Sequence, residues 1–295
     1  MKKNSENLRL FGIFGNPLAH TLSPVMQEAA FERTGWKAHY LAFEFGPKDF
    51  RKAMIGLSRF LIEGFNLTVP YKQTVMPYLD ALTPEARAVG AVNTVFRRGR
   101  RWVGANTDGD GFLTSLQKEG KFVPRGKRIL VLGAGGAARA VVYGLASRGA
   151  GKIRIAARRK GRAARIARDF RKAFPKTGFE ILEGPFEKLG PAFQDSDLVV
   201  NATPLGLKKK DPSPVPENVI PGKGKKILFF DLIYDPAPTS FLKTAAQKGH
   251  RTLGGLGMLL FQGARAFEYW TGKKAPVIEM RRSLEAALKE RHSSS

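Results

Sequence analysis

The stretch KRILVLGAGGAARAVVYGLASRG, residues 127–149, decides the fold that we expect, because it reads as a strand, a glycine-rich turn and a helix in succession. In that context a G-x-G-x-x-G/A pattern is the fingerprint of a dinucleotide-binding domain. Gly133 would allow the tight turn, Gly135 would let a pyrophosphate approach the backbone, and Ala138 would permit close helix–strand contact. The helix N-terminus would face the phosphates. A glycine turn in a ligand-free α/β domain is the alternative. The candidate cofactor-binding residues here are Gly133, Gly135, Gly136 and Ala137.

The next strand, KIRIAAR, predicts which dinucleotide binds. NAD-selective sites carry an acid ~20 residues beyond the first strand, where it binds the ribose 2′-hydroxyl. Here the strand ends in Ala157 and Arg158 with Arg162 close behind, and no Asp or Glu lies between Glu119 and Asp169. Arginines would pair with a 2′-phosphate in a fork, so we expect NADP, with Arg158 and Arg162 at the phosphate. A solvated basic helix face is the alternative, and we retain it for four other residues: Arg165, Arg168, Arg171 and Lys172.

Strands and helices alternate on both sides of this stretch. Upstream, residues 8–15, 38–45 and 64–69 have strand patterns separated by helical ones, and GAVNTVFRRGRRWVGANTDGDG reads as two strands around a tight turn. Downstream, SDLVVN and KKILFFD predict further strands, and the pattern is helical after Gly255. Strands separated by helices imply mostly parallel pairing, so the sequence predicts an α/β protein.

Composition excludes several functional classes. The chain has 295 residues, enough for two domains, and its 43% hydrophobic content is enough for a core. It has no cysteine, and its four histidines show no HExxH spacing, so we expect neither disulfides nor a metal site. The N-terminus lacks a signal-peptide pattern, and no apolar run approaches the ~18 residues of a membrane span. We therefore expect a cytoplasmic protein with no membrane partner.

The charge is strongly basic, at +25, and residues 151–176 contain 11 Lys or Arg against one Asp. Such a field attracts anions, so a basic nucleic-acid-binding protein is the alternative from another class. That function needs stacking aromatics or a docking helix. The basic run offers only Phe170 and Phe174, both spaced for packing on one helix face. We expect no specific nucleic-acid partner.

A second informative stretch is GFNLTVPYK, residues 64–72. It alternates apolar and polar residues as a strand does, and Pro70 suits the start of the helix-like run YKQTVMPYLD. Lys72 would thus lie near a helix N-terminus, where the helix dipole disfavours a cation. Hydride transfer to a ketone needs a proton donor, and no histidine is well placed. Lys72 and Asp108 remain the candidates.

Eight motifs together resemble the shikimate dehydrogenase family, which reduces 3-dehydroshikimate to shikimate with NADPH on the way to the aromatic amino acids. In order, they are GNPLAHTLSP (15–24), GFNLTVPYK (64–72), GAVNT (90–94), NTDGDG (106–111), GAGGAA (133–138), NATPLG (201–206), DLIYDP (231–236) and GGLGMLLFQG (254–263). The resemblance covers nearly the whole chain.

The resemblance also implies roles for individual residues. Lys72 and Asp108 match the catalytic pair. The hydroxyls that hold the substrate carboxylate match Thr21 and Ser23. The substrate pocket matches Asn66, Thr68, Asn93 and Gln262. Positions near the nicotinamide match Asn201, Thr203, Tyr234 and Gly255, and Ala157 completes the cofactor set. Neutral donors and acceptors of this kind suit a polyhydroxylated ring acid.

The same resemblance implies the domain organisation. We expect a substrate-binding and catalytic domain over 1–110, a Rossmann-type NADP domain over 111–255, C-terminal helices over 256–291 that pack back on the first domain, and a tail over 292–295. The partner would be a small molecule, and the state a monomer or homodimer.

Two positions depart from the family pattern. Thr21-Leu22-Ser23 stands where the family has Ser-x-Ser, and the extra methyl narrows the pocket, so a quinate/shikimate dehydrogenase paralogue is the alternative. Ala157-Arg158-Arg159 stands where the family has Asn-Arg-Thr, which removes an adenine-side contact. A methylenetetrahydrofolate-type dehydrogenase is a more distant alternative, against which the NTDGDG match argues.

Overall fold

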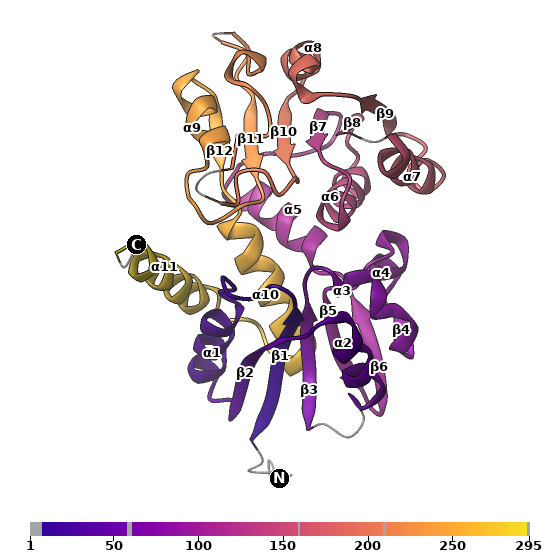
Figure 1. The fold of residues 1–295 in the computed structure, drawn as a ribbon, viewed down its shortest axis with the longest axis vertical. Coiled ribbons are helices and arrows are strands. Elements are labelled where there is room, and N and C mark those ends of the chain that lie inside the picture. Colours follow the sequence, from indigo (N-terminus) through magenta and orange to yellow (C-terminus); the bar gives the residue numbers. More distant parts are fainter. Residues whose placement is uncertain (1–7, 58–60, 159, 209–210, 223, 294–295) are drawn as a thin grey trace. The chain divides into compact units, whose positions relative to one another are not determined.

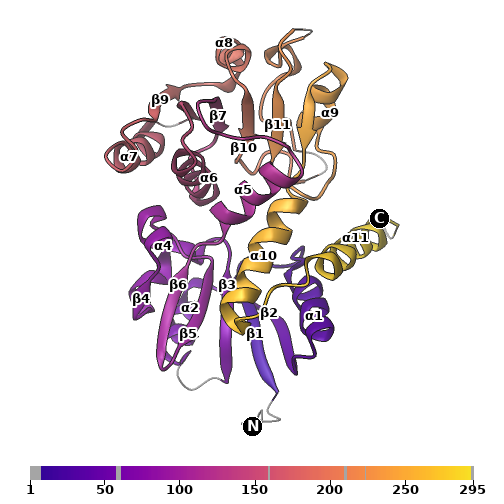
Figure 2. The ribbon, with the colours of Figure 1, turned by 180° about the vertical axis from the view of Figure 1, so that it is seen from behind.

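The computed structural model describes residues 8–57, 61–158, 160–208, 211–222 and 224–293. The chain forms two compact units. Unit 1 comprises Met1–Thr107 with Leu260–Ser295, and unit 2 comprises Asp108–Leu259. The predicted boundaries after residues 110 and 255 fall a few residues from these limits. Figures 1 and 2 show the elements of both units from opposite sides.

Unit 1 contains a mixed six-stranded sheet in the order β2-β1-β3-β5-β6-β4. β1 pairs in parallel with β2 and β3, whereas β5 pairs antiparallel with both β3 and β6. The bounds are β1 Arg9–Gly15, β2 Ala38–Glu44, β3 Ile62–Leu67, β4 Ala81–Leu82, β5 Thr94–Arg98 and β6 Arg101–Ala105. The hairpin β5–β6 confirms the tight turn predicted around Gly99, whose φ of 62° suits glycine.

Helices cover both faces of this sheet, as the strand alternation requires. Phe11 packs against Phe31 of α1 and Trp270 of α10, whereas Phe14 faces the cluster that contains Phe50 of α2. Figures 1 and 2 show α10 on one side of the strands and α2 on the other. The bounds are α1 Ser23–Thr34, α2 Pro47–Ile55, α3 Tyr71–Thr74, η2 Met76–Tyr78, α4 Pro84–Val89, α10 Leu256–Thr271 and α11 Val277–Ser293.

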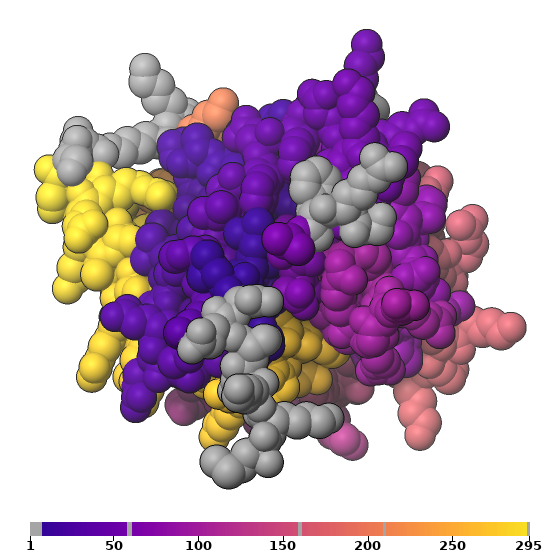
Figure 3. All heavy atoms as spheres, turned by 90° about the horizontal axis from the view of Figure 1, so that it is seen from below, coloured from indigo at the N-terminus to yellow at the C-terminus, as the bar shows by residue number. Residues whose placement is uncertain are grey.

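Two details of unit 1 refine the predicted helices. The run after Pro70 is not one helix but α3 followed by η2, because Pro77 interrupts the helical ladder at the start of η2. The C-terminal helix α11 continues to Ser293 and pairs with α1 through an Arg33–Glu279 ion pair of 3.0 Å. The yellow C-terminal residues border the indigo N-terminal ones in Figure 3.

Unit 2 contains a fully parallel sheet in the order β12-β11-β10-β7-β8-β9. This is the doubly wound dinucleotide-binding order, which reverses direction between β7 and β10. The bounds are β7 Arg128–Leu132, β8 Lys152–Ala157, β9 Gly178–Glu183, β10 Leu198–Asn201, β11 Leu228–Asp231 and β12 Arg251–Leu253. The predicted Rossmann-type fold is confirmed, and β9 and β12 complete it.

The helices of unit 2 lie over two separate apolar layers. Ile129, Val131 and Ile153 pack in one cluster with α5, α6 and α7, whereas Leu130 and Leu132 pack in another with α8 and α9. The bounds are α5 Asp108–Lys118, α6 Gly136–Ser147, α7 Lys160–Arg171, η3 Phe186–Lys188, α8 Gly190–Gln194, η4 Glu217–Val219 and α9 Ser240–Gln247. Within the described residues, no helix combines the length and apolar character that a membrane crossing requires.

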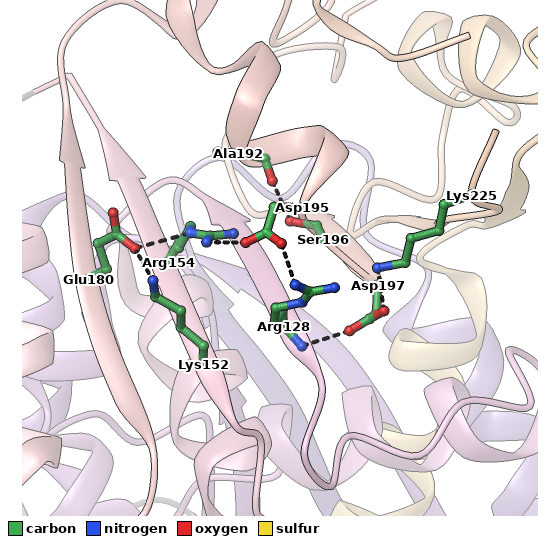
Figure 4. Close-up of polar contacts among 9 residues, drawn as sticks. All are labelled: Arg128, Lys152, Arg154, Glu180, Ala192, Asp195, Ser196, Asp197 and Lys225. Carbon is green, nitrogen blue, oxygen red and sulfur yellow. Dashed lines mark hydrogen bonds and ion pairs between the residues drawn. The ribbon is translucent and has the colours of Figure 1, made fainter. Parts of the chain in front are cut away.

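An ion-pair cluster lies at the amino ends of the unit 2 strands (Figure 4). Arg154 on β8, only 9% exposed, donates to both Asp195 and Glu180. Arg128 also pairs with Asp195, at 2.5 Å, and Lys152 with Glu180, at 2.7 Å. The cations lower the pKa of both carboxyl groups. Arg128 begins β7 and Lys152 begins β8, so this cluster lies at the end of the sheet opposite the glycine turn.

Candidate functional site

The glycine turn of unit 2 has the shape that a bound pyrophosphate requires. Gly133 has a φ of 105°, and a Cβ there would come within 2.9 Å of the Ala202 carbonyl oxygen. Gly135 and Gly136 face open space: apart from the adjoining residues of the turn and helix, no described residue has an atom within 4 Å of the place a Cβ would occupy. No side chain caps α6, so its first backbone N–H groups are available to an anion. The residues fit a dinucleotide phosphate.

The end of β8 carries the predicted basic residues. Ala157 is buried, Arg158 is exposed, and Arg162 is exposed in the first turn of α7. Arg159 lies outside the described residues. Ala157 is in register with Glu183 of β9, an acid that is distant along the chain and that only the strand pairing brings to the end of β8. The two described arginines remain available for a 2′-phosphate.

The loops after β10 and β11 meet at a buried carboxylate. Asp231 is 0% exposed and accepts hydrogen bonds from Asn201 Nδ2 at 3.0 Å, Ile233 N at 3.1 Å and Thr239 Oγ1 at 2.7 Å. Burial raises the pKa of Asp231, and these three donors oppose the increase. Asn201 Oδ1 accepts from Thr203, through both its N and its Oγ1. Asn201 therefore hydrogen-bonds to other protein groups, and it connects the loop after β10 to the end of β11.

Two further residues of the expected cofactor side belong to this edge of unit 2. A Cβ on Gly255 would lie 2.1 Å from the Leu232 carbonyl oxygen, so only glycine fits beside the loop that carries Tyr234. The Gly255 N–H donates to Ile233 O at 3.0 Å, and Tyr234 is half-buried. This contact fixes the chain just before α10 against the end of β11.

In unit 1, the asparagines predicted for the substrate pocket form one buried network. Asn66 Nδ2 donates to Asn93 O and to Thr94 Oγ1, both at 3.0 Å. Asn93 Oδ1 accepts from Thr107 N at 2.7 Å, and its Nδ2 donates to Thr107 Oγ1 at 2.9 Å and Gln262 Oε1 at 3.3 Å. The structure thus brings Asn66, Asn93 and Gln262 together, from β3, the residue before β5, and α10.

Tyr40 of β2 belongs to this network through a hydrogen bond to Asn66. Its hydroxyl donates to Asn66 Oδ1 at 2.7 Å, and its side chain is 1% exposed. Burial raises the pKa of Tyr40 well above its usual range, and a hydrogen bond with Ser23 partly offsets the increase. Tyr40 therefore links Ser23, at the start of α1, to Asn66. Its position in an alternating strand marked it only as a core residue, which is why no functional role was predicted for it.

The remaining polar candidates of unit 1 lie at the carboxyl ends of β1 and β3. Thr21 Oγ1 accepts from Ser23 N at 3.3 Å, and Ser23 begins α1 with 5% exposure. Thr68 and Lys72 are half-buried. The carbonyl of Lys72 accepts from Val92 N at 2.7 Å, which places α3 beside the residue that precedes Asn93.

Asp108 starts α5 in unit 2 and is 5% exposed. It directly follows Thr107, whose backbone and hydroxyl bind Asn93 in unit 1. Thr94 and Thr107 also belong to this hydrogen-bond network, and neither was among the predicted site residues, although both lie inside quoted motifs. Their hydroxyls are 3.3 Å apart and fully buried, and only the fold reveals that contact.

Three family models match the chain. The shikimate dehydrogenase substrate binding domain matches residues 13–95, shikimate / quinate 5-dehydrogenase matches 117–234, and the shikimate 5′-dehydrogenase C-terminal domain matches 255–285. Together they cover parts of both units.

Individual relatives agree over nearly the full length. The shikimate dehydrogenase (NADP(+)) of Symbiobacterium thermophilum is 43% identical over 95% of this chain and 95% of its own. The shikimate dehydrogenase structure from Aquifex aeolicus is 39% identical, with a TM-score of 0.83 over 94% of this chain and 97% of its own. The shikimate 5-dehydrogenase of Thermus thermophilus, solved with NADP(H) and shikimate, is 36% identical, with a TM-score of 0.82 over 95% and 100% of the two chains. The chain described here therefore belongs to the shikimate dehydrogenase family.

Proposed function

We propose that this protein catalyses the reversible, NADP-dependent interconversion of 3-dehydroshikimate and shikimate, a step towards the aromatic amino acids. The observation that carries the proposal is the neutral polar wall of unit 1, where Asn66, Asn93 and Gln262 join in one network. Such groups suit a hydroxylated ring without leaving a charge buried and unpaired. The relatives named above support the same substrate class.

The cofactor would bind on unit 2, and it supplies the hydride when bound. The pyrophosphate would lie on the uncapped N-terminus of α6, against Gly133, Gly135, Gly136 and Ala137. Arg158 and Arg162 would pair with the 2′-phosphate, beside Ala157. Asn201, Thr203, Tyr234 and Gly255 would shape the nicotinamide end. The absence of a side-chain cap on α6 supports this arrangement, because its donors stay available.

The substrate would be held by its carboxylate and hydroxyls. Thr21 and Ser23 would bind the carboxylate, and the Thr21 oxygen already accepts from the Ser23 backbone N–H, so its own proton can point to a ligand. Asn66, Thr68, Asn93 and Gln262 would contact the ring hydroxyls. The methyl group of Thr21 makes quinate the substrate to compare directly.

Lys72 would transfer the proton. Lysine side chains are protonated at neutral pH, so Lys72 can donate to the oxygen at C3 as the ketone is reduced. Asp108 would hold the ammonium group in place. In the oxidative direction Lys72 would act as the base and accept the proton of the C3 hydroxyl.

The decisive experiment is a spectrophotometric assay of NADP⁺ reduction by shikimate and by quinate, repeated with NAD⁺. The proposal requires shikimate with NADP⁺ to give the highest kcat/KM. Preferred oxidation of quinate would identify the paralogue instead, and equal rates with both cofactors would refute the role of Arg158 and Arg162.

Lys72→Ala should lower kcat by at least about 10²-fold, the usual contribution of general acid–base help, while KM for shikimate changes little. Turnover close to that of the wild type in this variant would contradict the assignment of Lys72.

Self-association is expected to stop at a homodimer, which sedimentation at two concentrations would test.

A further inference from the structure

One buried carboxylate takes no part in the proposed chemistry. Asp231 is 0% exposed, and within the described part of the chain the hydrogen-bond partners of its carboxylate are three uncharged donors. Burying a charge is costly unless donors compensate for it. Three donors do so here, from β10, from the loop after β11 and from the start of α9. A carboxylate retained under such conditions needs a reason.

The carboxylate fixes the orientation of the neighbouring amide. An ionised Asp231 only accepts hydrogen bonds, so Asn201 must turn its Nδ2 towards it. The same Nδ2 donates to Leu205 O at 3.3 Å. The Asn201 carbonyl oxygen must therefore point the other way, where it accepts from Thr203 N at 3.0 Å and Thr203 Oγ1 at 2.7 Å.

The hydroxyl of Thr203 is in turn fixed both as a donor and as an acceptor. The hydroxyl donates to Asn201 and accepts from Leu205 N at 3.2 Å. With these bonds made, the segment presses against the glycine turn. A Cβ on Gly133 would lie 2.9 Å from Ala202 O and 3.2 Å from Thr203 Cγ2. The chain of contacts runs from Asp231 through Asn201 and Thr203 to the turn.

We propose that Asp231 is a positioning residue for the dinucleotide: through Asn201 it holds residues 202–203 against Gly133 and so sets the shape of the phosphate-binding turn. The inference rests on the proposed function only in taking NADPH as the ligand. Asp231 itself is fully buried and cannot touch the cofactor. Its effect on binding must therefore pass through Asn201 and its neighbours.

The test uses the full chain and titrates NADPH, whose fluorescence reports binding without turnover. The variants are Asp231→Asn, which removes the charge and keeps the shape, Thr203→Val, which removes the hydroxyl, and the double variant. Thr203→Ser is the conservative rescue. Thr177→Val is the matched control, because Thr177 is also buried and donates to a backbone carbonyl, Ala150 O at 2.8 Å, far from the glycine turn in the same unit.

Asp231→Asn and Thr203→Val should each raise the Kd of NADPH about tenfold, the effect of one net hydrogen bond, whereas Thr203→Ser and Thr177→Val should stay within about twofold. The double variant should bind no more weakly than the weaker single variant, because both substitutions break the same chain. Multiplicative effects, or a folded Asp231→Asn with the Kd of the wild type, would overturn the inference.

If Asp231→Asn does not fold, Thr239→Val compared with Thr177→Val decides the question, because Thr239 Oγ1 donates to Asp231 at 2.7 Å and lies outside the proposed cofactor site. Failure of the proposed function looks different, because the wild-type chain itself would then not bind NADPH. Shikimate turnover measured over a range of NADP⁺ concentrations provides the second readout. A positioning role predicts a changed KM for NADP⁺ with kcat largely kept. Simple destabilisation instead lowers the fraction of active enzyme, so the apparent kcat falls while KM for NADP⁺ is kept.

Discussion

Asp195→Ala should destabilise unit 2 more than Arg154→Met, although both substitutions break the same ion pair (Figure 4). After loss of Arg154, each acid keeps a second cation, since Arg128 pairs with Asp195 and Lys152 with Glu180. After loss of Asp195, the buried guanidinium keeps only Glu180. Its Nη1 already lacks a hydrogen-bond partner among the described residues, so both terminal nitrogens would then be unpaired.

The magnitudes follow from burial. Asp195 and Glu180 are more than a third exposed, so solvent screens both pairs, and their loss in Arg154→Met should cost about 1 kcal/mol in total. Methionine keeps much of the packing of the arginine stem. Asp195→Ala loses two such pairs, with Arg128 and Arg154, and also leaves a buried donor unsatisfied, a penalty of about 1–3 kcal/mol. We expect about 2–3 kcal/mol for this variant.

Urea denaturation followed by circular dichroism would measure the difference, which corresponds to several degrees in Tm at about 2–4 °C per kcal/mol. Asp49→Ala is the control, because its pair with Lys52 is exposed, and it should change the unfolding free energy by less than about 0.5 kcal/mol. If Arg154→Met proves as destabilising as Asp195→Ala, the buried Arg154 guanidinium does not depend on Asp195 as its hydrogen-bond acceptor.

Three other outcomes are expected. Tyr40→Phe should lower the unfolding free energy by about 1–3 kcal/mol, because Asn66 Oδ1 loses its donor, and it should raise KM for shikimate; an unchanged Tm and KM would remove Tyr40 from the network. Gly133→Ala should weaken NADPH binding, because its φ of 105° and the 2.9 Å approach to Ala202 O both oppose a Cβ, and titration with NADPH would show this. The acids of the Figure 4 cluster have native pKa values below their ordinary values of 4.5 for Glu180 and 3.8 for Asp195 and Asp197. Their stabilisation is therefore complete above those ordinary values and is lost as the pH falls through the lowered native values. Acid titration of Tm should therefore be shallower in Arg154→Met, and an identical slope would argue against the pairing.

The turn around Gly133 was predictable because its constraints are local. A buried strand, glycines at fixed offsets and an alanine-rich helix leave few alternative conformations. The ends of β3 and β8 were also predictable, because the residues that mark each strand end are adjacent in the sequence. The three strands that were not predicted lack such signals. β4 has two residues, β12 has three, and β9 contains Gly178 and two acids, so none of them shows a clear apolar pattern.

The polar networks could not be derived from local pattern. Tyr40 and Asn66 are 26 residues apart, and Asn93 and Gln262 are 169 apart. Their contacts depend on strand order and on the return of α10 to unit 1. Asp231 was quoted within a motif, but its role depends on the register that pairs it with Asn201 across two parallel strands. The sequence motifs identified most of these residues, but their hydrogen-bond partners follow only from the topology of the fold.

Strand β8 is electrostatically asymmetric along its length. Its first residues, Lys152 and Arg154, are neutralised by acids, whereas no ion pair to Arg158 or Arg162 occurs within the described residues at its other end. The positive potential of this strand is thus concentrated where a phosphorylated ligand would arrive. Such a gradient accelerates diffusional encounter and loses its effect as salt screens it. The association rate of NADPH should therefore fall with ionic strength more steeply than its dissociation rate rises.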